Sequence, residues 1–319
     1  MKTVFVTGIS GYVAKSFVRN CRDKFRLVGL DIKQDKELAD IEFFKEDVRS
    51  KGAREALRKT KPDVLLHLAY IFNPPKKRDD ARSVNVEGTR NVLEGAREAR
   101  VKQVVILSSA TAYGAHPDNP VPLKEDSPLR GDLNKGFWYS EDKVSQEKIA
   151  REFAEENPAV KVAVARACIV LGENVDNFVS QSTFKTPFSF ITGGDVPFQF
   201  IDEEDVATAL LKIIGKEASG AFNLAGGGYV CLSGMAGIMG KKAMKVPNSK
   251  IVHRLFLWLL KKAGMVDKNI PLAFIDFFSY PWVVDTGKAQ EELGFIPKYT
   301  SEETFKRAYE VWNHRKKIH

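Results

Sequence analysis

The chain has 319 residues, of which 44% are hydrophobic and 28% charged, and it carries a formal net charge of +8. This composition is that of an ordinary globular protein, and the length allows a large core divided between two lobes. The lysines and arginines are spread among nearly as many acidic residues, which favours a solvated surface over a nucleic-acid-binding one. We therefore expect no nucleic-acid partner.

Three cysteines, Cys21, Cys168 and Cys231, are widely spaced and odd in number. They form neither a CxxC pair nor a disulfide framework, which is typical of a protein in a reducing cytoplasm. The longest apolar segment, 255–260, is far too short to span a bilayer, so we expect no membrane partner. His67 lies in an apolar run with no metal-spaced partner, so we expect a core residue and no metal site.

The first 31 residues predict a strand, a glycine turn, a helix and a second strand that ends in an acid. The run 3–6 is apolar, as a buried parallel strand requires. Gly8 lets the backbone turn sharply, and Gly11 lets a pyrophosphate approach the main chain where the helix offers free N–H groups. Asp31 lies about twenty residues further on, where a carboxylate can bind both hydroxyls of a ribose. A glycine-rich turn in another α/β fold is the alternative.

Further along, apolar runs alternate with helical patterns. The strand expected over 41–48 carries Asp47 near its end, where it could hydrogen-bond an adenine amino group or cap the helix expected over 49–60. The remaining strands are expected over 63–69, 104–109, 160–170 and 221–225, and the helices over 84–99, 137–156 and 204–216. This alternation predicts an α/β fold with a doubly wound parallel sheet of about seven strands, and a ligand at the carboxyl ends of the strands. The remainder is predicted to be mainly helical.

Tyr139 and Lys143 lie four residues apart on a predicted helix, so both side chains project from one face. A lysine ammonium beside a phenol favours the phenolate and lowers a pKa that is ordinarily about 10. The tyrosine could then exchange a proton with a substrate hydroxyl. Ser109 ends a predicted strand, where its hydroxyl could hydrogen-bond a reacting carbonyl. An ordinary surface pair on a helix is the alternative for the tyrosine and lysine alone.

With these residues in place, nearly the whole chain resembles the extended short-chain dehydrogenase/reductase family, of the NAD-dependent epimerase/dehydratase type. The segments that carry the resemblance are 7–14, with Ala14 where many members have glycine, Asp47-Val48, His67-Leu68-Ala69, 85–93, Ser108-Ser109, Tyr113-Gly114, 139–143, 166–172, 205–207 and 285–297.

The resemblance implies a Rossmann-type fold and NAD as the cofactor. It implies that Tyr139 is the general acid/base, that Lys143 holds the nicotinamide ribose and tunes Tyr139, and that Ser109 orients the substrate oxygen. The residues expected to bind the cofactor are Gly8, Ser10, Gly11, Tyr12, Val13, Asp31, Ile32, Asp47, Val48, Leu68, Ala69, Tyr70, Ser108, Tyr139 and Lys143.

The resemblance also implies an NAD-binding domain of residues 1–171 that returns at 198–225. A substrate-binding lobe is then formed by 172–197 and 226–319. Family members commonly pair through the helices expected here over 84–99 and 137–156, so we expect a homodimer.

Departures from the family pattern narrow the reaction. Ala110 and Thr111 stand where sugar 4,6-dehydratases carry an Asp-Glu pair, so hydride transfer without loss of water is expected. Ile169 stands where nucleotide-sugar enzymes often place an asparagine, and Phe198 where they often place an arginine against the diphosphate. Arg166 could substitute as an anchor. We expect Thr111, Arg166, Ile169 and Phe198 to form the substrate site.

Two reactions follow from this pattern, both on a small-molecule substrate. The first is a nucleotide-sugar 4-epimerase-like reaction at a secondary alcohol or ketone carbon. The alternative is net NAD-dependent oxidation or reduction of an apolar hydroxy or keto substrate, as in 3β-hydroxysteroid dehydrogenases. Phe256, Trp258 and the segment 274–282 add aromatic residues to the second lobe, either as pocket surface or as its core. A non-enzymatic relative would be expected to lack Tyr139 or Lys143.

Overall fold

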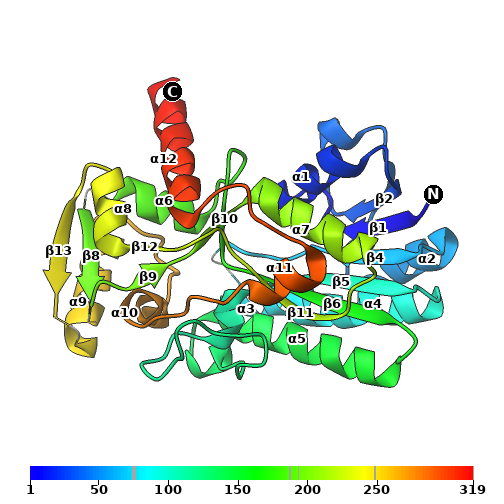
Figure 1. The fold of residues 1–319 in the computed structure, drawn as a ribbon, viewed down its shortest axis with the longest axis horizontal. Coiled ribbons are helices and arrows are strands. Elements are labelled where there is room, and N and C mark those ends of the chain that lie inside the picture. The colour runs from blue at the N-terminus through cyan, green and yellow to red at the C-terminus, as the bar shows by residue number, and fades with distance from the viewer. Residues whose placement is uncertain (74–76, 187, 193, 248, 319) are drawn as a thin grey trace.

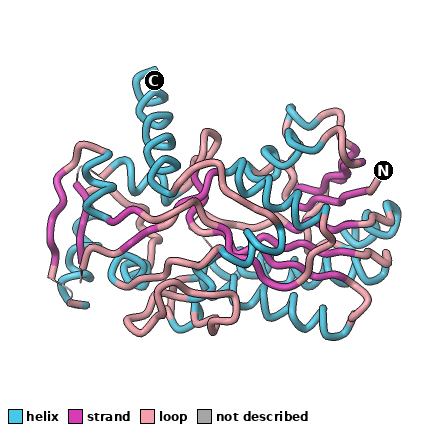
Figure 2. The backbone as a smooth tube through the Cα atoms, in the orientation of Figure 1, coloured by secondary structure: helices cyan, strands magenta, loops and turns pink. Residues whose placement is uncertain are grey.

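The computed structural model describes residues 1–73, 77–186, 188–192, 194–247 and 249–318. One end of the molecule is a parallel sheet covered by helices on both faces, and the other is a smaller lobe (Figures 1 and 2). No helix in these described ranges is long and apolar enough to cross a membrane.

Seven parallel strands form the main sheet. Their order is β11(Gly220–Leu224), β6(Lys161–Ala167), β5(Gln103–Ser109), β4(Val64–His67), β1(Thr3–Thr7), β2(Arg26–Asp31) and β3(Glu42–Lys45). The order reverses between β1 and β4, which is where such sheets open a crevice at the carboxyl ends of their strands. The predicted doubly wound fold is confirmed.

Alternate side chains of the strands enter two separate cores. Val4 and Val6 pack with one set of helices, α1(Tyr12–Cys21) and α7(Glu203–Gly215), whereas Phe5 packs with the other. That second set is α2(Lys51–Thr60), α4(Gly88–Glu98) and α5(Trp138–Glu156). The period of two along the strands therefore separates the helical layers. His67 is buried between Thr7 and Thr89, each hydroxyl bonded to a ring nitrogen, as expected for a core residue.

The second lobe is mainly helical, as predicted. Its elements are α6(Phe178–Lys185), α8(Leu232–Ile238), α9(Lys250–Lys262), η5(Leu272–Ile275), α10(Asp276–Ser279), α12(Ser301–Ile318), and the strand pairs β8(Phe188–Thr192) with β13(Lys242–Val246) and β9(Pro197–Phe198) with β12(Val230–Cys231). The other short elements are η1(Lys36–Leu38), α3(Arg78–Arg82), a π-helical turn η2(Ser83–Glu87), η3(Ala110–Tyr113), η4(Gly131–Leu133) and α11(Gly287–Leu293).

Two local expectations differ from the structure. The single strand expected over 160–170 is divided, because β6 ends at Ala167 and β7(Ile169–Leu171) pairs instead with β10(Phe200–Asp202). A continuous apolar run does not reveal this change of partner. The helix cap is also different: Ser50 caps α2 by accepting a hydrogen bond from the Ala53 amide at 3.0 Å, so Asp47 does not cap it.

The β7–β10 pair connects the two ends of the molecule, and β9 pairs with the second lobe. With this connection in view, we propose the domain division expected from sequence: an NAD-binding domain of 1–171 and 198–225, and a substrate-binding lobe of 172–197 and 226–319.

A buried ionic network ties α5 to the sheet. Glu147 accepts hydrogen bonds from the Arg166 guanidinium at 2.8–3.1 Å and from the Ser108 hydroxyl at 2.5 Å. Arg166 also donates to the Tyr113 hydroxyl at 2.6 Å and the Glu125 carbonyl at 2.8 Å. Both charged partners are buried, so neither can exchange the other for water.

Removing either Glu147 or Arg166 should destabilise the folded protein. We expect Glu147→Ala to lower the free energy of unfolding by about 3–5 kcal/mol, since it leaves the Arg166 charge buried and unpaired. Urea denaturation measures it. Glu152→Ala on the same helix is the control, because the Glu152 carboxylate is exposed and 3.9 Å from Arg90, and it should change the stability by less than about 1 kcal/mol. Equal losses in the two variants would contradict the role of the network.

Candidate active site

The glycine turn after β1 leaves no room for a side chain. Gly8 has φ +70°, and a Cβ there would lie 2.6 Å from the Cα and amide nitrogen of Ala69 at the end of β4. Gly11 precedes α1 and donates its amide to the Gly8 carbonyl at 3.0 Å. At the end of β2, the Asp31 carboxylate accepts hydrogen bonds from the amides of Ser10 at 3.1 Å and Ile32 at 2.8 Å. The main chain at the start of α1 is therefore exposed to a ligand, as a pyrophosphate requires.

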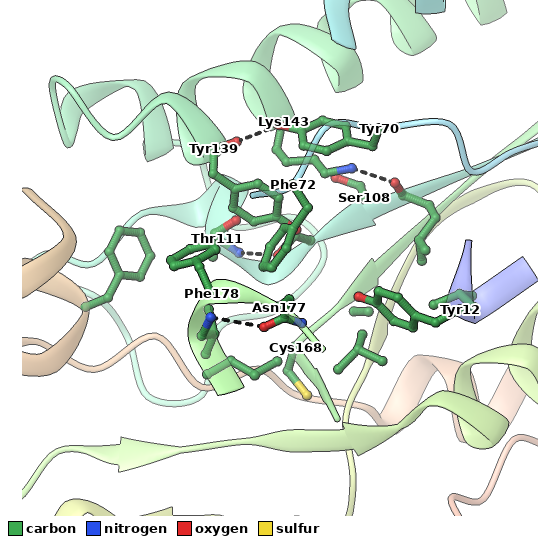
Figure 3. A pocket seen from close by; sticks show the side chains of 18 of the residues that line it. Tyr12, Tyr70, Phe72, Ser108, Thr111, Tyr139, Lys143, Cys168, Asn177 and Phe178 are labelled. Atoms are coloured by element: carbon green, nitrogen blue, oxygen red, sulfur yellow. Dashed lines mark hydrogen bonds between the residues drawn. The ribbon is translucent and has the colours of Figure 1, made fainter. Parts of the chain in front are cut away.

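A cavity of about 180 Å³ runs from this turn to the predicted catalytic residues (Figure 3). At one end it is lined by Gly8, Gly11, Tyr12, Val13 and Ala14, and at the other by Ser109, Tyr139 and Lys143. A cradle that a Cβ would fill, beside a helix N-terminus with no acidic residue in its first turn, fits a dinucleotide phosphate.

The other residues expected to bind the cofactor fall into two groups. Leu68, Tyr70 and Ser108 line the cavity, and Ala69 lies behind Gly8. Ser10, Asp31, Ile32, Asp47 and Val48 lie outside the residues that line it. The hydrogen bonds from Arg49 lower the pKa of Asp47, and they occupy both of its carboxylate oxygens.

Ser109 and Tyr139 both line this cavity, so the structure brings the strand end and the helix together as expected. The expected lowering of the Tyr139 pKa is not found. Burial raises the pKa of Tyr139 to about 12, and the nearby Ser109 hydroxyl lowers this pKa only in part. The Lys143 ammonium lies 3.9 Å from the centre of the Tyr70 ring and 5.9 Å from that of Tyr139, so it is nearer to the other tyrosine.

Lys143 is itself buried and held by neutral acceptors. Its ammonium donates to the Leu107 carbonyl at 2.8 Å and the Gln146 side-chain oxygen at 3.0 Å. Burial lowers the pKa of Lys143 to about 7, whereas the carboxylates of Glu147 and Asp142 raise it. Its charge therefore titrates near neutral pH.

Asp142, the residue before Lys143, is fully buried and anchors the same turn of α5 from the opposite side. Its carboxylate accepts hydrogen bonds from Arg78 at 2.6 and 2.9 Å, from Arg82 at 2.9 Å and from Asn85 at 3.0 Å. Sequence reasoning did not single out this cluster, because its members are separated by about 60 positions and form no motif.

Three of the four expected substrate residues line the cavity: Thr111, Ile169 and Phe198. The Thr111 hydroxyl is buried and has no hydrogen-bond partner among the described residues, so it can serve a ligand. Arg166 does not line the cavity. Its guanidinium is instead paired with the buried Glu147, so the structure does not place Arg166 where the expected substrate anchor would lie.

Aromatic side chains from both lobes form a large part of the remaining cavity wall. They are Phe72, Phe137, Phe178, Phe274, Phe277, Phe278 and Trp282. Sequence reasoning noted only the segment 274–282, as pocket surface or core, since the other rings are scattered and follow no periodicity. Tyr12 of the glycine turn and Asn177, whose side chain caps α6 of the second lobe, both line the cavity.

The model of the NAD dependent epimerase/dehydratase family matches residues 4–225, more than half of the chain, and the protein therefore belongs to this family. An uncharacterised protein of Mycobacterium tuberculosis is 26% identical, over 95% of this chain and 82% of the relative. The UDP-glucose 4-epimerase of Mycolicibacterium smegmatis is 32% identical, over 46% of this chain and 49% of its own.

Among solved structures, a short-chain dehydrogenase/reductase superfamily protein of Agrobacterium tumefaciens with bound NAD has a TM-score of 0.75 at 18% identity. The match covers 99% of this chain and 98% of that one, and it shows the fold alone. The family match thus confirms the expected NAD-dependent epimerase/dehydratase type, and the solved structure agrees with the expected Rossmann-type fold.

The charge of Asp31 should decide the choice of cofactor. We expect NAD to bind more tightly than NADP, because the carboxylate would repel a 2′-phosphate, and Asp31→Ala to reduce the NAD affinity by about tenfold or more. Isothermal titration of both cofactors measures this. Asp40→Ala removes an exposed carboxylate paired with Arg22 and should leave both affinities unchanged. Tighter binding of NADP to the unaltered protein would contradict the assignment.

Proposed function

We propose that the protein binds NAD and transfers a hydride at a secondary alcohol or ketone carbon. One observation carries the proposal: Ser109, Tyr139 and Lys143 line the same cavity as Gly8 and Gly11 of the glycine turn. A cofactor bound at the glycine turn and a substrate bound beside it would therefore both lie close to a group able to move a proton. The family description supports NAD as the cofactor.

NAD, when bound, supplies or accepts the hydride. The chain's own residues handle the oxygen and its proton. With a pKa of about 12, Tyr139 is a neutral phenol near pH 7, able to donate to a substrate carbonyl in reduction and to recover the proton in oxidation. Ser109 orients the same oxygen. Lys143 is the positioning group for the cofactor ribose in this proposal.

Nucleotide-sugar 4-epimerisation is the first candidate reaction. It is supported by relatives named UDP-glucose 4-epimerase that match part of the chain. Such a reaction oxidises the sugar, holds the ketone while it turns, and returns the hydride to the opposite face. It requires firm anchoring of the diphosphate, which arginine and lysine ordinarily provide.

Net oxidation or reduction of an apolar alcohol or ketone is the second candidate, and the cavity wall favours it. Among the described residues that line the cavity, Lys143 is the single basic one, and the Phe198 side chain packs against Phe278 and Trp282 rather than offering a cation. A wall of this kind suits an apolar substrate, since it offers a diphosphate few donors.

One assay separates the candidates. The purified protein is incubated with UDP-glucose or UDP-galactose, and separately with NAD and a panel of secondary alcohols. Interconversion of the sugars without net NADH supports the epimerase. Accumulation of NADH with an alcohol, and no turnover of sugar, supports the net oxidoreductase.

Tyr139 should be essential to either reaction. We expect Tyr139→Phe to lower turnover by about 10²–10⁴-fold, because the proton has no carrier, while NAD affinity stays nearly unchanged. Steady-state kinetics and titration of NAD measure the two effects. Tyr229→Phe, at an exposed tyrosine, is the control and should behave like the unaltered protein. A fully active Tyr139→Phe variant would refute the role.

We also propose a cytoplasmic homodimer that pairs through α5 and the helix formed by η2 and α4. The three free cysteines support the compartment, and the family resemblance supports the pairing. Light scattering at micromolar concentration should give twice the 35.7 kDa of one chain. A monomer mass alone would count against the pairing.

A further inference from the structure

A second cavity, of about 110 Å³, lies inside the second lobe. Its lining is almost wholly apolar and comes from α6, α8, α9 and the segment 266–278. The inner face of α9 contributes His253, Phe256, Leu257 and Leu260. Nothing in the proposed reaction uses this space.

Two aromatic side chains separate this cavity from the one that holds Tyr139. Phe274 and Phe278 line both cavities, with ring centres 5.2 Å apart. Phe274 also contacts Phe137 and Phe178 of the first cavity, at 5.5 and 5.7 Å between ring centres. Phe274 and Phe278 are therefore shared walls of the two cavities, and a ligand that extended from one cavity into the other would pass them.

His253 is the one ionisable side chain among the described residues that line this cavity, beside the hydroxyl-bearing Ser182, Thr183 and Thr186. The residue is 6% exposed, and its Nε2 atom has no hydrogen-bond partner among the described residues. An unpaired polar atom buried in an apolar wall is costly unless a ligand completes it. Burial lowers the pKa of His253, so the ring is neutral at pH 7. A hydroxyl can both donate and accept, so it suits either tautomer of a neutral imidazole.

We propose that the second cavity holds the far end of an elongated apolar substrate whose reacting alcohol or ketone lies at Tyr139, and that a hydroxyl at this far end hydrogen-bonds His253. The proposal rests on the second candidate reaction and deepens it by naming the substrate class. It assigns Phe274 and Phe278 as the residues between which the substrate passes.

Binding to the full chain tests this without turnover. The probes are 2-alkanols of six to fourteen carbons and the same alcohols with a terminal hydroxyl, measured by titration calorimetry in the presence of NAD. Affinity should rise about fourfold per methylene until the second cavity is full. The terminal hydroxyl should tighten binding only at the lengths that reach His253.

Matched variants locate the effect. Leu257→Trp fills the second cavity and should abolish the gain for long chains while leaving short alcohols unchanged. Leu255→Trp, on the exposed side of the same helix, is the control and should change neither. His253→Phe should remove the preference for the terminal hydroxyl, roughly five- to tenfold, and keep the chain-length dependence.

The outcomes separate this proposal from the proposed function. Chain-length dependence that is absent, or that survives Leu257→Trp, overturns the proposal even if short alcohols are oxidised. Length-dependent binding that Leu257→Trp abolishes, with no NADH formed, supports the cavity assignment and overturns the oxidoreductase candidate.

A different observation concerns the outer surface of the same lobe. Residues 241–268 contain eight lysines and arginines and one acidic residue, Asp267, so this segment alone carries +7 of the net charge of +8. The excess of positive charge, which the composition suggested was spread over the chain, is therefore concentrated in this segment. Its elements, β13 and α9, form the end of the molecule farthest from the N-terminus (Figure 1).

The exposed side of α9 is apolar as well. Ile251, Leu255, Trp258 and Leu259 are 79%, 58%, 49% and 49% exposed, and their spacing places them on one face of the helix. The Lys262 ammonium lies 4.3 Å from the centre of the Trp258 ring. Large apolar side chains, a tryptophan and flanking lysines are the features of a helix that lies in a membrane interface.

We infer that this basic and apolar end of the molecule docks on an anionic phospholipid surface. The positive charge complements the lipid headgroups, and the apolar stripe enters the boundary below them. α9 has 13 residues, so it lies on the membrane and does not span it. This revises the expectation of no membrane partner, which considered only spanning segments.

Vesicle co-sedimentation tests the docking. The protein should bind vesicles with 30% phosphatidylglycerol and not vesicles of phosphatidylcholine alone, and higher salt should weaken the binding. The double variant Leu255→Ser with Leu259→Ser should reduce binding about tenfold or more, whereas Leu133→Ser, at an exposed leucine elsewhere, should not. Equal binding of both variants, or none by the unaltered protein, overturns the inference. So does a dimer that the double variant converts to a monomer.

Discussion

The active site depends on how α5 is fastened to the sheet. Two buried carboxylates, Asp142 and Glu147, flank Lys143 along the helix and face in different directions. Asp142 is held by arginines that come from α3, and Glu147 by Arg166 of β6. Anchors at both places resist rotation and sliding of the helix. Tyr139, one turn before Lys143, is therefore held near the end of β5. Charge pairs that contribute little net stability can still fix geometry in this way.

The same burial sets the chemistry of the two titratable groups. Burial disfavours charge, so it raises the pKa of Tyr139 and lowers that of Lys143. Near neutral pH the phenol keeps its proton, while the lysine is close to its midpoint. In the reaction proposed above, Tyr139 could therefore give its proton to the substrate oxygen.

One helix connects the two inferences about the second lobe. The inner face of α9 lines the apolar cavity behind Phe274 and Phe278, and its outer face carries the exposed apolar stripe. An apolar substrate that partitions into a membrane would then have a short path to the interior. The two inferences are nonetheless independent, because substitutions at different positions of α9 test each of them.

The sequence by itself determined the fold and the positions of the chemistry. Gly8, Gly11 and Asp31 are readable because a dinucleotide turn needs particular backbone conformations at a set spacing. Tyr139 and Lys143 are readable because four residues make one helical turn. These constraints involve residues close together in the chain, so the spacing in the sequence is enough to predict them.

Only the tertiary structure decided which groups meet across the chain. Arg166 looked free to bind a diphosphate until its pairing with Glu147 was visible, and the pKa of Tyr139 could not be foreseen without the depth of its burial. The aromatic residues of the cavity wall are scattered between Phe72 and Trp282 and follow no periodicity, so a sequence pattern does not predict them. Burial and pairing depend on residues distant in sequence, and a single sequence carries no record of those distances.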